Sequence, residues 1–106
     1  MKAISDSSPL IYLSKIGCLP LLKEVFEELI IPQGVYEEVI LEGKRQKKNE
    51  IASIERLIEE KFVLVKEPRQ FVEIENLGKG EKECVSLCKE LRIETLLIDE
   101  TIGFTV

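Results

Sequence analysis

The chain contains no histidine and no tryptophan, one methionine and three cysteines. Without histidine, neither Ser-His-Asp nor Cys-His catalysis is available, so any hydrolysis must depend on carboxylates, metal ions or lysine. Cys84 and Cys88 lie one helical turn apart, and Cys18 is the only other thiol. We therefore expect the cysteines to act as small core hydrophobes rather than as disulfides or a structural zinc site.

Long apolar runs and the basic-then-apolar start of a signal peptide are also absent. We expect a cytoplasmic protein that does not enter a membrane. With 106 residues, 44% hydrophobic and 33% charged, residues 1–106 are predicted to form a single soluble domain. The net charge of −5 argues against broad electrostatic capture of nucleic acid. It leaves open a nuclease in which metal ions bridge substrate phosphates to carboxylates.

Aspartate is scarce, since only two of the 20 acidic residues are aspartates. Asp6 follows the strand-like run KAIS, and Asp99 follows TLLI. In open α/β sheets, ligands bind beyond the carboxyl ends of the strands, where the strand order reverses. Two carboxylates at such a place suit a hard cation such as Mg²⁺. The alternative is that both residues only cap helices or form turns, because aspartate is a favoured N-cap.

Short apolar runs alternate with segments of helical periodicity along the whole chain. The predicted strands are residues 2–5, 28–31, 62–65 and 95–98. The first predicted helix has Ser8 as its N-cap and Pro9 as its first residue, and it ends at Gly17. A second helix begins within 19–26, and a third is closed by Gly43. The last two cover 51–58 and about Gly80 to Arg92. Residues 66–78 read as irregular, with a turn or short helix at 71–74. This alternation predicts an α/β fold with a parallel sheet covered on both faces.

Four segments resemble PIN domains, specifically the VapC-like group with an SDSSPLI start and a GEAEAI-type central helix. The segments are SDSSPLIYLSKIG, IPQGVYEEVILEG, GKGEKECVSLCKEL and TLLIDETIG, in that order. The resemblance covers essentially the whole chain and implies a three-layer α/β/α fold. It also implies a metal-dependent ribonuclease, of which many are toxins in toxin–antitoxin pairs.

The resemblance implies four catalytic and metal-binding acids, carried over residue by residue: Asp6, Glu38, Glu81 and Asp99. Asp6 and Asp99 would hold the main Mg²⁺ or Mn²⁺ ion. Glu38 and Glu81 would place a second ion or the attacking water, and Ser7 would support the site. Because clustered carboxylates repel one another, a real cluster favours a bound cation.

The residues alone leave two of these assignments open. Periodicity does not say whether Glu37 or Glu38 points at the sheet, and Glu81 also reads as an ordinary helix-start glutamate. The basic cluster has two readings as well, as RNA phosphate contacts or as a solvated loop or helix start. Its members are Lys44, Arg45, Lys47 and Lys48.

PIN domains usually continue past the fourth acid with a helix and a fifth strand, whereas this sequence ends at Val106. Phe104 stands near the place where relatives more often carry an arginine. A shortened inactive relative, a fragment, and a sheet completed by a partner chain are the three explanations. A missing edge strand leaves backbone groups unpaired, which favours a homodimer.

Three functions follow. The first is a Mg²⁺- or Mn²⁺-dependent ribonuclease of toxin type, with RNA as substrate and an antitoxin as partner. The second is an inactive, shortened module that binds an antitoxin or a second copy of itself. The third is a metal-dependent phosphatase or nucleotide-binding protein, although the chain has no Walker motif and GKG at 78–80 is too short for a phosphate loop.

Overall fold

The computed structural model describes residues 1–45 and 51–98, which form a four-stranded sheet flanked by helices. The strands are β1 (Lys2–Ser5), β2 (Glu28–Pro32), β3 (Val63–Lys66) and β4 (Thr95–Leu97). Their order across the sheet is β3-β2-β1-β4, and every neighbouring pair is parallel. The predicted parallel α/β fold is confirmed.

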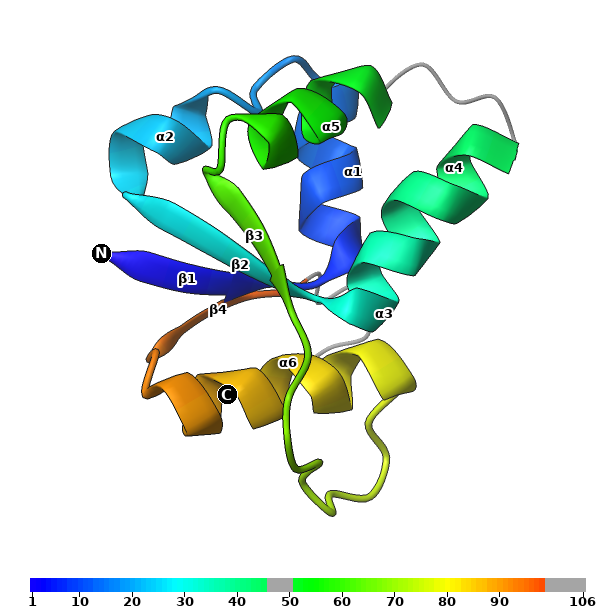
Figure 1. The fold of residues 1–106 in the computed structure, drawn as a ribbon, viewed down its shortest axis with the longest axis vertical. Coiled ribbons are helices and arrows are strands. Elements are labelled where there is room, and N and C mark those ends of the chain that lie inside the picture. The colour runs from blue at the N-terminus through cyan, green and yellow to red at the C-terminus, as the bar shows by residue number, and fades with distance from the viewer. Residues whose placement is uncertain (46–50, 99–106) are drawn as a thin grey trace.

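Helices cover both faces of this sheet (Figure 1). Their bounds are α1 (Ser7–Lys15), α2 (Leu21–Val25), α3 (Gln33–Tyr36), the π-helical turn η1 (Glu37–Leu41), α4 (Glu42–Arg45), α5 (Ile51–Glu59) and α6 (Lys79–Leu91). Helix α6 lies on one side of the sheet, and α1, α2 and α5 lie on the other. The arrangement therefore has the three layers that were predicted.

The core is centred on the two middle strands, β1 and β2. Ile4, Leu29 and Ile31 have no exposed surface, and Ile30 is almost as deeply buried. Successive residues of a strand face opposite sides of the sheet, so burial of all of them requires cover on both faces. Each such side chain contributes about 1.5–3 kcal/mol of burial free energy, which fixes the central strands and the residues that follow them.

The predicted start of the first helix is wrong by two residues. We expected Ser8 to be the N-cap, but helix α1 begins at Ser7 and its N-cap is Asp6. The Asp6 carboxylate oxygen Oδ1 accepts a hydrogen bond from the backbone N–H of Ser7 at 2.8 Å. Pro9 is still accommodated, because the first turn of a helix has N–H groups without intrahelical acceptors and proline lacks that group.

Gly43 does not end its helix, contrary to the prediction. Elements α3, η1 and α4 follow one another without a gap, so one helical run extends from Gln33 to Arg45. Gly43 is buried within it, and a side chain there would overlap Ile51 at the start of α5. The glycine therefore permits close helix packing rather than termination. The expected turn or short helix at 71–74 is also absent, because that segment has no regular structure.

Candidate active site

The strand order reverses between β1 and β4. The chain steps from β1 to β2 to β3 in one direction, and β4 then returns to the other side of β1. Ser5 pairs with Leu97 in the register of these two strands, and the backbone N–H of Asp6 donates to the carbonyl of Leu97 at 3.0 Å. Asp6 therefore lies at the switch point, where parallel α/β sheets bind their ligands.

The side chain of Asp6 lies against the first turn of α6. A Cβ atom built on Gly80, the second residue of that helix, would be 3.1 Å from Asp6 Oδ1. Glycine at this position leaves room for the carboxylate. The N-terminal end of a helix carries partial positive charge, so it stabilises an anionic side chain placed there.

Glu81 is the next residue of α6 and is partly exposed. Its Oε1 atom would be 3.4 Å from a Cβ built on Gly78, the N-cap of the helix. The carboxylate is thus turned back over the N-terminus of α6, as a glutamate three residues after an N-cap commonly is. The structure brings Asp6 and Glu81 to the same end of the same helix.

The pKa of the Cys84 thiol is affected by the carboxylates around it. Burial and the Asp6 carboxylate raise the pKa of the Cys84 thiol far above its ordinary value, and Glu83 and Glu81 raise it further. Carboxylates from two elements therefore act on one buried atom. Cys84 is part of the core and Cys88 packs against it, as predicted, whereas Cys18 is partly exposed and does not belong to the core.

We predict that native Cys84 is inert toward iodoacetamide at pH 8. The thiolate is the reactive form, and both burial and the raised pKa suppress it. Cys18 is partly exposed, so it is expected to be alkylated first. Mass spectrometry of digested protein measures modification at each site, with the protein unfolded in denaturant as the control. Equal modification of Cys18 and Cys84 in the native state would contradict the buried site.

Glu38 lies on a different element from this pair. It is exposed on η1, as is its neighbour Glu37, so exposure does not choose between them. Glu38 is not among the carboxylates that raise the pKa of Cys84. Asp99 lies outside the described residues, as does Phe104; the strand that precedes Asp99 ends at Leu97, beside Asp6.

One carboxylate at the site was missed by the sequence reasoning. Glu83 is only 4% exposed, and its Oε2 atom accepts a hydrogen bond from the backbone N–H of Gly34 at 3.1 Å. The periodicity did contain a signal, because Glu83 lies four residues before the inward-facing Leu87 and next to Cys84. It was overlooked because glutamate is rarely buried without a partner.

The basic cluster is placed differently from the prediction. Lys44 and Arg45 belong to the last turn of α4, not to a loop or a helix start, whereas Lys47 and Lys48 lie outside the described residues. Lys44 pairs with Glu55 at 2.8 Å, and Arg45 pairs with Glu42. The hydrogen bond and charge of Glu55 raise the pKa of Lys44.

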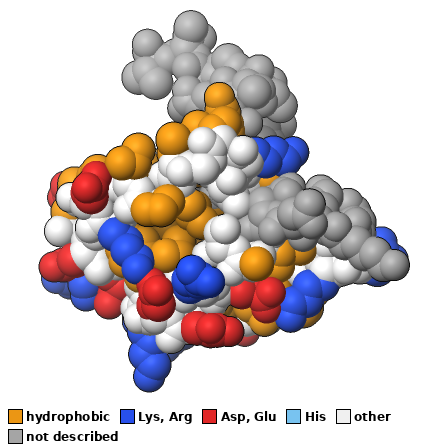
Figure 2. All heavy atoms as spheres, turned by 90° about the horizontal axis from the view of Figure 1, so that it is seen from above, with side chains coloured by type: hydrophobic (Ala, Val, Ile, Leu, Met, Phe, Trp, Pro, Cys, Tyr) orange, Lys and Arg blue, Asp and Glu red, His pale blue; other side chains and the backbone are white. Residues whose placement is uncertain are grey.

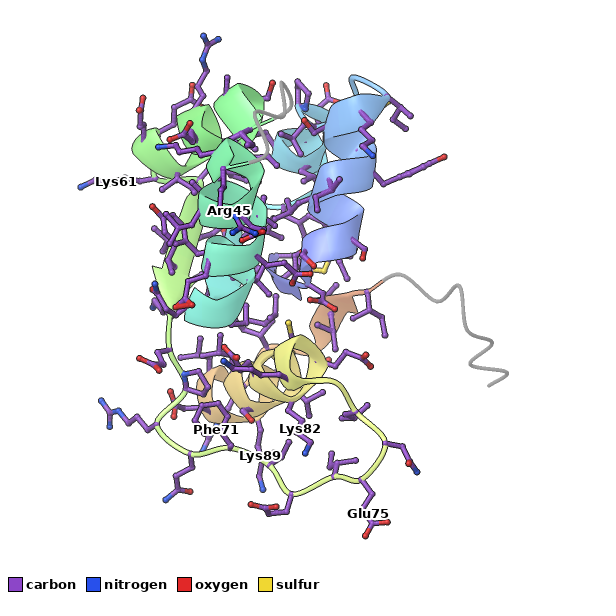
Figure 3. The ribbon with its side chains drawn as sticks, turned by 90° about the vertical axis from the view of Figure 1, so that its right-hand side faces the viewer. Arg45, Lys61, Phe71, Glu75, Lys82 and Lys89 are labelled. Carbon is purple, nitrogen blue, oxygen red and sulfur yellow. The ribbon has the colours of Figure 1, made fainter. Side chains whose placement is uncertain are left out.

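Charge is mixed in sign on the face of the molecule that Figure 2 shows. Figure 2 shows lysine and arginine side chains interspersed with acidic ones around an apolar hollow. This hollow lies between α1, α2 and α5, and its lining includes Leu19, Pro20 and Leu57. Lys82 and Lys89 lie on α6 toward the 66–78 segment, and Arg45 lies on α4 (Figure 3). The face in Figure 2 is therefore not a broad basic one, which agrees with the net negative charge.

The donors at the site suit magnesium better than zinc. Asp6 and Glu81 offer carboxylate oxygens, and the nearby Cys84 thiol is held in its protonated form. Within residues 1–45 and 51–98 there is no group of three or more potential ligands arranged to hold a metal. Mg²⁺ keeps several waters and is usually bound by one or two carboxylates together with substrate phosphates. The described residues fit such an open site.

These features define an α/β protein with an acidic site at the switch point of a parallel sheet. A family model described as a PIN domain matches residues 2–106, and the chain belongs to this family. Membership indicates a nuclease that uses divalent metal ions and binds RNA. No curated protein and no solved structure gives a significant match. Among the described residues, no helix has the length and apolar character needed to cross a bilayer.

Proposed function

We propose that this PIN domain is a Mg²⁺- or Mn²⁺-dependent endoribonuclease of the VapC-like toxin type, acting in the cytoplasm. The observation that carries the proposal is the position of Asp6 at the β1/β4 switch point, against the first turn of α6 and beside Glu81. In this proposal, Asp6, Glu81, Glu38 and Asp99 are the four acids that bind the ions.

A divalent ion bound there would polarise the scissile phosphoryl group and lower the pKa of an attacking water. The protein's part is to hold oxygen ligands in place. Asp6 uses one lone pair of Oδ1 for the N–H of Ser7, and an ionised carboxylate has about four acceptor positions, so others remain for an ion. Glu81 is held at the same helix end, with its partly exposed carboxylate accessible to a solvated phosphate.

The direct test is RNA cleavage by the full chain, purified free of any partner. We expect cleavage of single-stranded RNA in Mg²⁺ or Mn²⁺, and none in EDTA. Restored cleavage after the ion is added back would show that the metal, not the chelator, is responsible. If neither ion supports cleavage of any RNA tested, the proposal is wrong.

Glu38 can be separated from Glu37 by a matched pair of variants. Both residues are exposed neighbours on η1, so Glu38→Gln and Glu37→Gln should have similarly small effects on folding. If Glu38 helps to bind the second ion or the water, Glu38→Gln should slow cleavage by about 10-fold or more, while Glu37→Gln leaves it unchanged. Initial rates at saturating Mn²⁺ measure this. Equal rates for the two variants would remove Glu38 from the site.

Exposed apolar side chains favour a second function, binding of a protein partner. Tyr12 on α1, Ile16 at the C-cap of α1, and Leu21 and Val25 on α2 are each more than half exposed. Where exposed apolar side chains lie together, they commonly mark a protein interface. The partner would be an antitoxin or a second copy of the chain. Light scattering after size-exclusion chromatography tests the homodimer, and cleavage lost in Asp99→Asn would contradict a purely non-catalytic module.

A further inference from the structure

Glu83 joins two helices that each carry a proposed metal-binding acid. It lies on α6 two residues after Glu81, and its carboxylate faces the beginning of α3. A Cβ atom built on Gly34 would be 2.5 Å from Glu83 Oε1 and 2.8 Å from Oε2. The carboxylate therefore packs directly on the backbone of Gly34, and only glycine allows this approach.

The hydrogen bond from Gly34 supplies a helix cap that the local sequence does not provide. The N-cap of α3 is Pro32, whose side chain makes no capping hydrogen bond. The first N–H groups of a helix have no intrahelical acceptor, and their positive partial charge favours an anion. Glu83 meets this requirement from another element, so the start of the α3–η1–α4 run is fixed by a side chain of α6.

Glu38 lies four residues after Gly34 in this same helical run. The contact between Glu83 and Gly34 thus helps to set the distance between the helix that carries Glu81 and the helix that carries Glu38. Ligand groups need to be held to about 0.5 Å by surrounding contacts to function well. The hydrogen bond between Gly34 and Glu83 is one such contact between these helices, and a buried carboxylate makes it.

We propose that Glu83 is a positioning residue for the metal site: its buried carboxylate caps α3 and so aligns Glu38 with Glu81. This inference rests on the proposed metal-dependent nuclease function. Glu83 itself binds neither ion nor RNA in the proposal, and it acts only through Gly34. The simpler alternative is that Glu83 stabilises the fold without affecting the metal site.

The test compares Glu83→Gln and Glu83→Leu in the full chain. Glutamine retains an oxygen that can accept the Gly34 hydrogen bond, whereas leucine has similar bulk and no acceptor. The Mn²⁺ concentration that gives half-maximal RNA cleavage is measured for each, together with the melting temperature without metal. Contacts that orient metal ligands typically change metal affinity by about 10–100-fold, so Glu83→Leu should raise this concentration at least ~10-fold. Glu83→Gln should stay within about 3-fold of wild type, at the weak end of such effects.

Ser86→Ala is the matched control. Ser86 is also a buried polar residue of α6, but its hydroxyl donates to the carbonyl of Lys82 and accepts from the N–H of Val72. It secures the 66–78 segment and not α3. Ser86→Ala is therefore expected to lower the melting temperature while leaving the half-maximal Mn²⁺ concentration unchanged. A raised Mn²⁺ requirement in Ser86→Ala as well would show that general loosening of α6 is enough, and would overturn the inference.

Two further results distinguish the possible failures. If wild type cleaves RNA and Glu83→Leu has the same Mn²⁺ requirement, Glu83 is only structural and the nuclease proposal stands. If wild type has no metal-dependent cleavage, the nuclease proposal fails and this inference fails with it. Should Glu83→Leu not fold, Gly34→Ala replaces it, because the added methyl group displaces the Glu83 carboxylate from the other side. The same rise in Mn²⁺ requirement is then expected.

Discussion

Asp6→Asn is expected to abolish metal-dependent RNA cleavage without destabilising the fold. Asparagine is as good an N-cap as aspartate, so its side-chain oxygen can still accept from the Ser7 N–H. What it loses is the negative charge beside Glu81 at the N-terminus of α6. If the metal contributes several kcal/mol to the reaction, removing a principal ligand should lower the cleavage rate by about 10²–10³-fold.

The melting temperature gives an independent measure of the same site. At ten times its dissociation constant, a ligand stabilises the folded state by about 1.4 kcal/mol, which is roughly 5–10 °C for a domain of this size. Wild type should show this shift in Mn²⁺, and Asp6→Asn should not. Without metal, Asp6→Asn should melt close to wild type, because the lost attraction to the N-terminus of α6 and the relieved repulsion between carboxylates oppose each other.

Asp6→Ala serves as the control for the capping role. Alanine removes both the charge and the cap of α1, so it should cost about 1 kcal/mol that Asp6→Asn does not. If Asp6 were only a cap, Asp6→Ala would lower stability and Asp6→Asn would behave like wild type in every assay. Full cleavage activity in Asp6→Asn would therefore reduce Asp6 to a structural residue.

The parallel sheet could be predicted from the sequence because its signals are local. Four apolar runs that alternate with segments of helical periodicity are sufficient to indicate strands and crossover helices. Asp6 could be assigned to a strand end for the same reason. In a parallel sheet, the residue that follows a strand lies at the edge formed by the carboxyl ends of the strands, regardless of the rest of the sequence. Asp6 lies at this edge.

Features that depend on packing between distant segments could not be predicted in this way. Glycine at 43 looked like a helix end, but it is required by the approach of Ile51. The role of Glu83 depends on a backbone group 49 residues earlier in the chain, at Gly34. Asp6 and not Ser8 is the N-cap because strand β1 ends at Ser5, directly before Asp6. In each case the residue type is compatible with several local structures, and packing against a distant part of the chain determines which one forms.

Glu81→Gln is the other change expected to have a large effect. Glutamine can replace glutamate three residues after an N-cap, so a purely structural Glu81 would tolerate it. The lost charge at the helix N-terminus should cost about 0.3–1 kcal/mol at most. A metal-binding Glu81 predicts a much larger result: about 10²-fold slower cleavage, equivalent to roughly 2.7 kcal/mol of lost transition-state stabilisation.

Glu75→Gln provides the matched comparison for Glu81→Gln. Glu75 is exposed on the 66–78 segment, at the outer end of its loop in Figure 3, so it reports the effect of removing one negative charge away from the site. Both variants reduce the net negative charge by one, which by itself should slightly favour RNA binding. Glu75→Gln is therefore expected to cleave at the wild-type rate or faster. If Glu81→Gln also cleaves RNA at the wild-type rate or faster, Glu81 has only a structural role at the start of α6. The metal ion would then have to be bound by other residues.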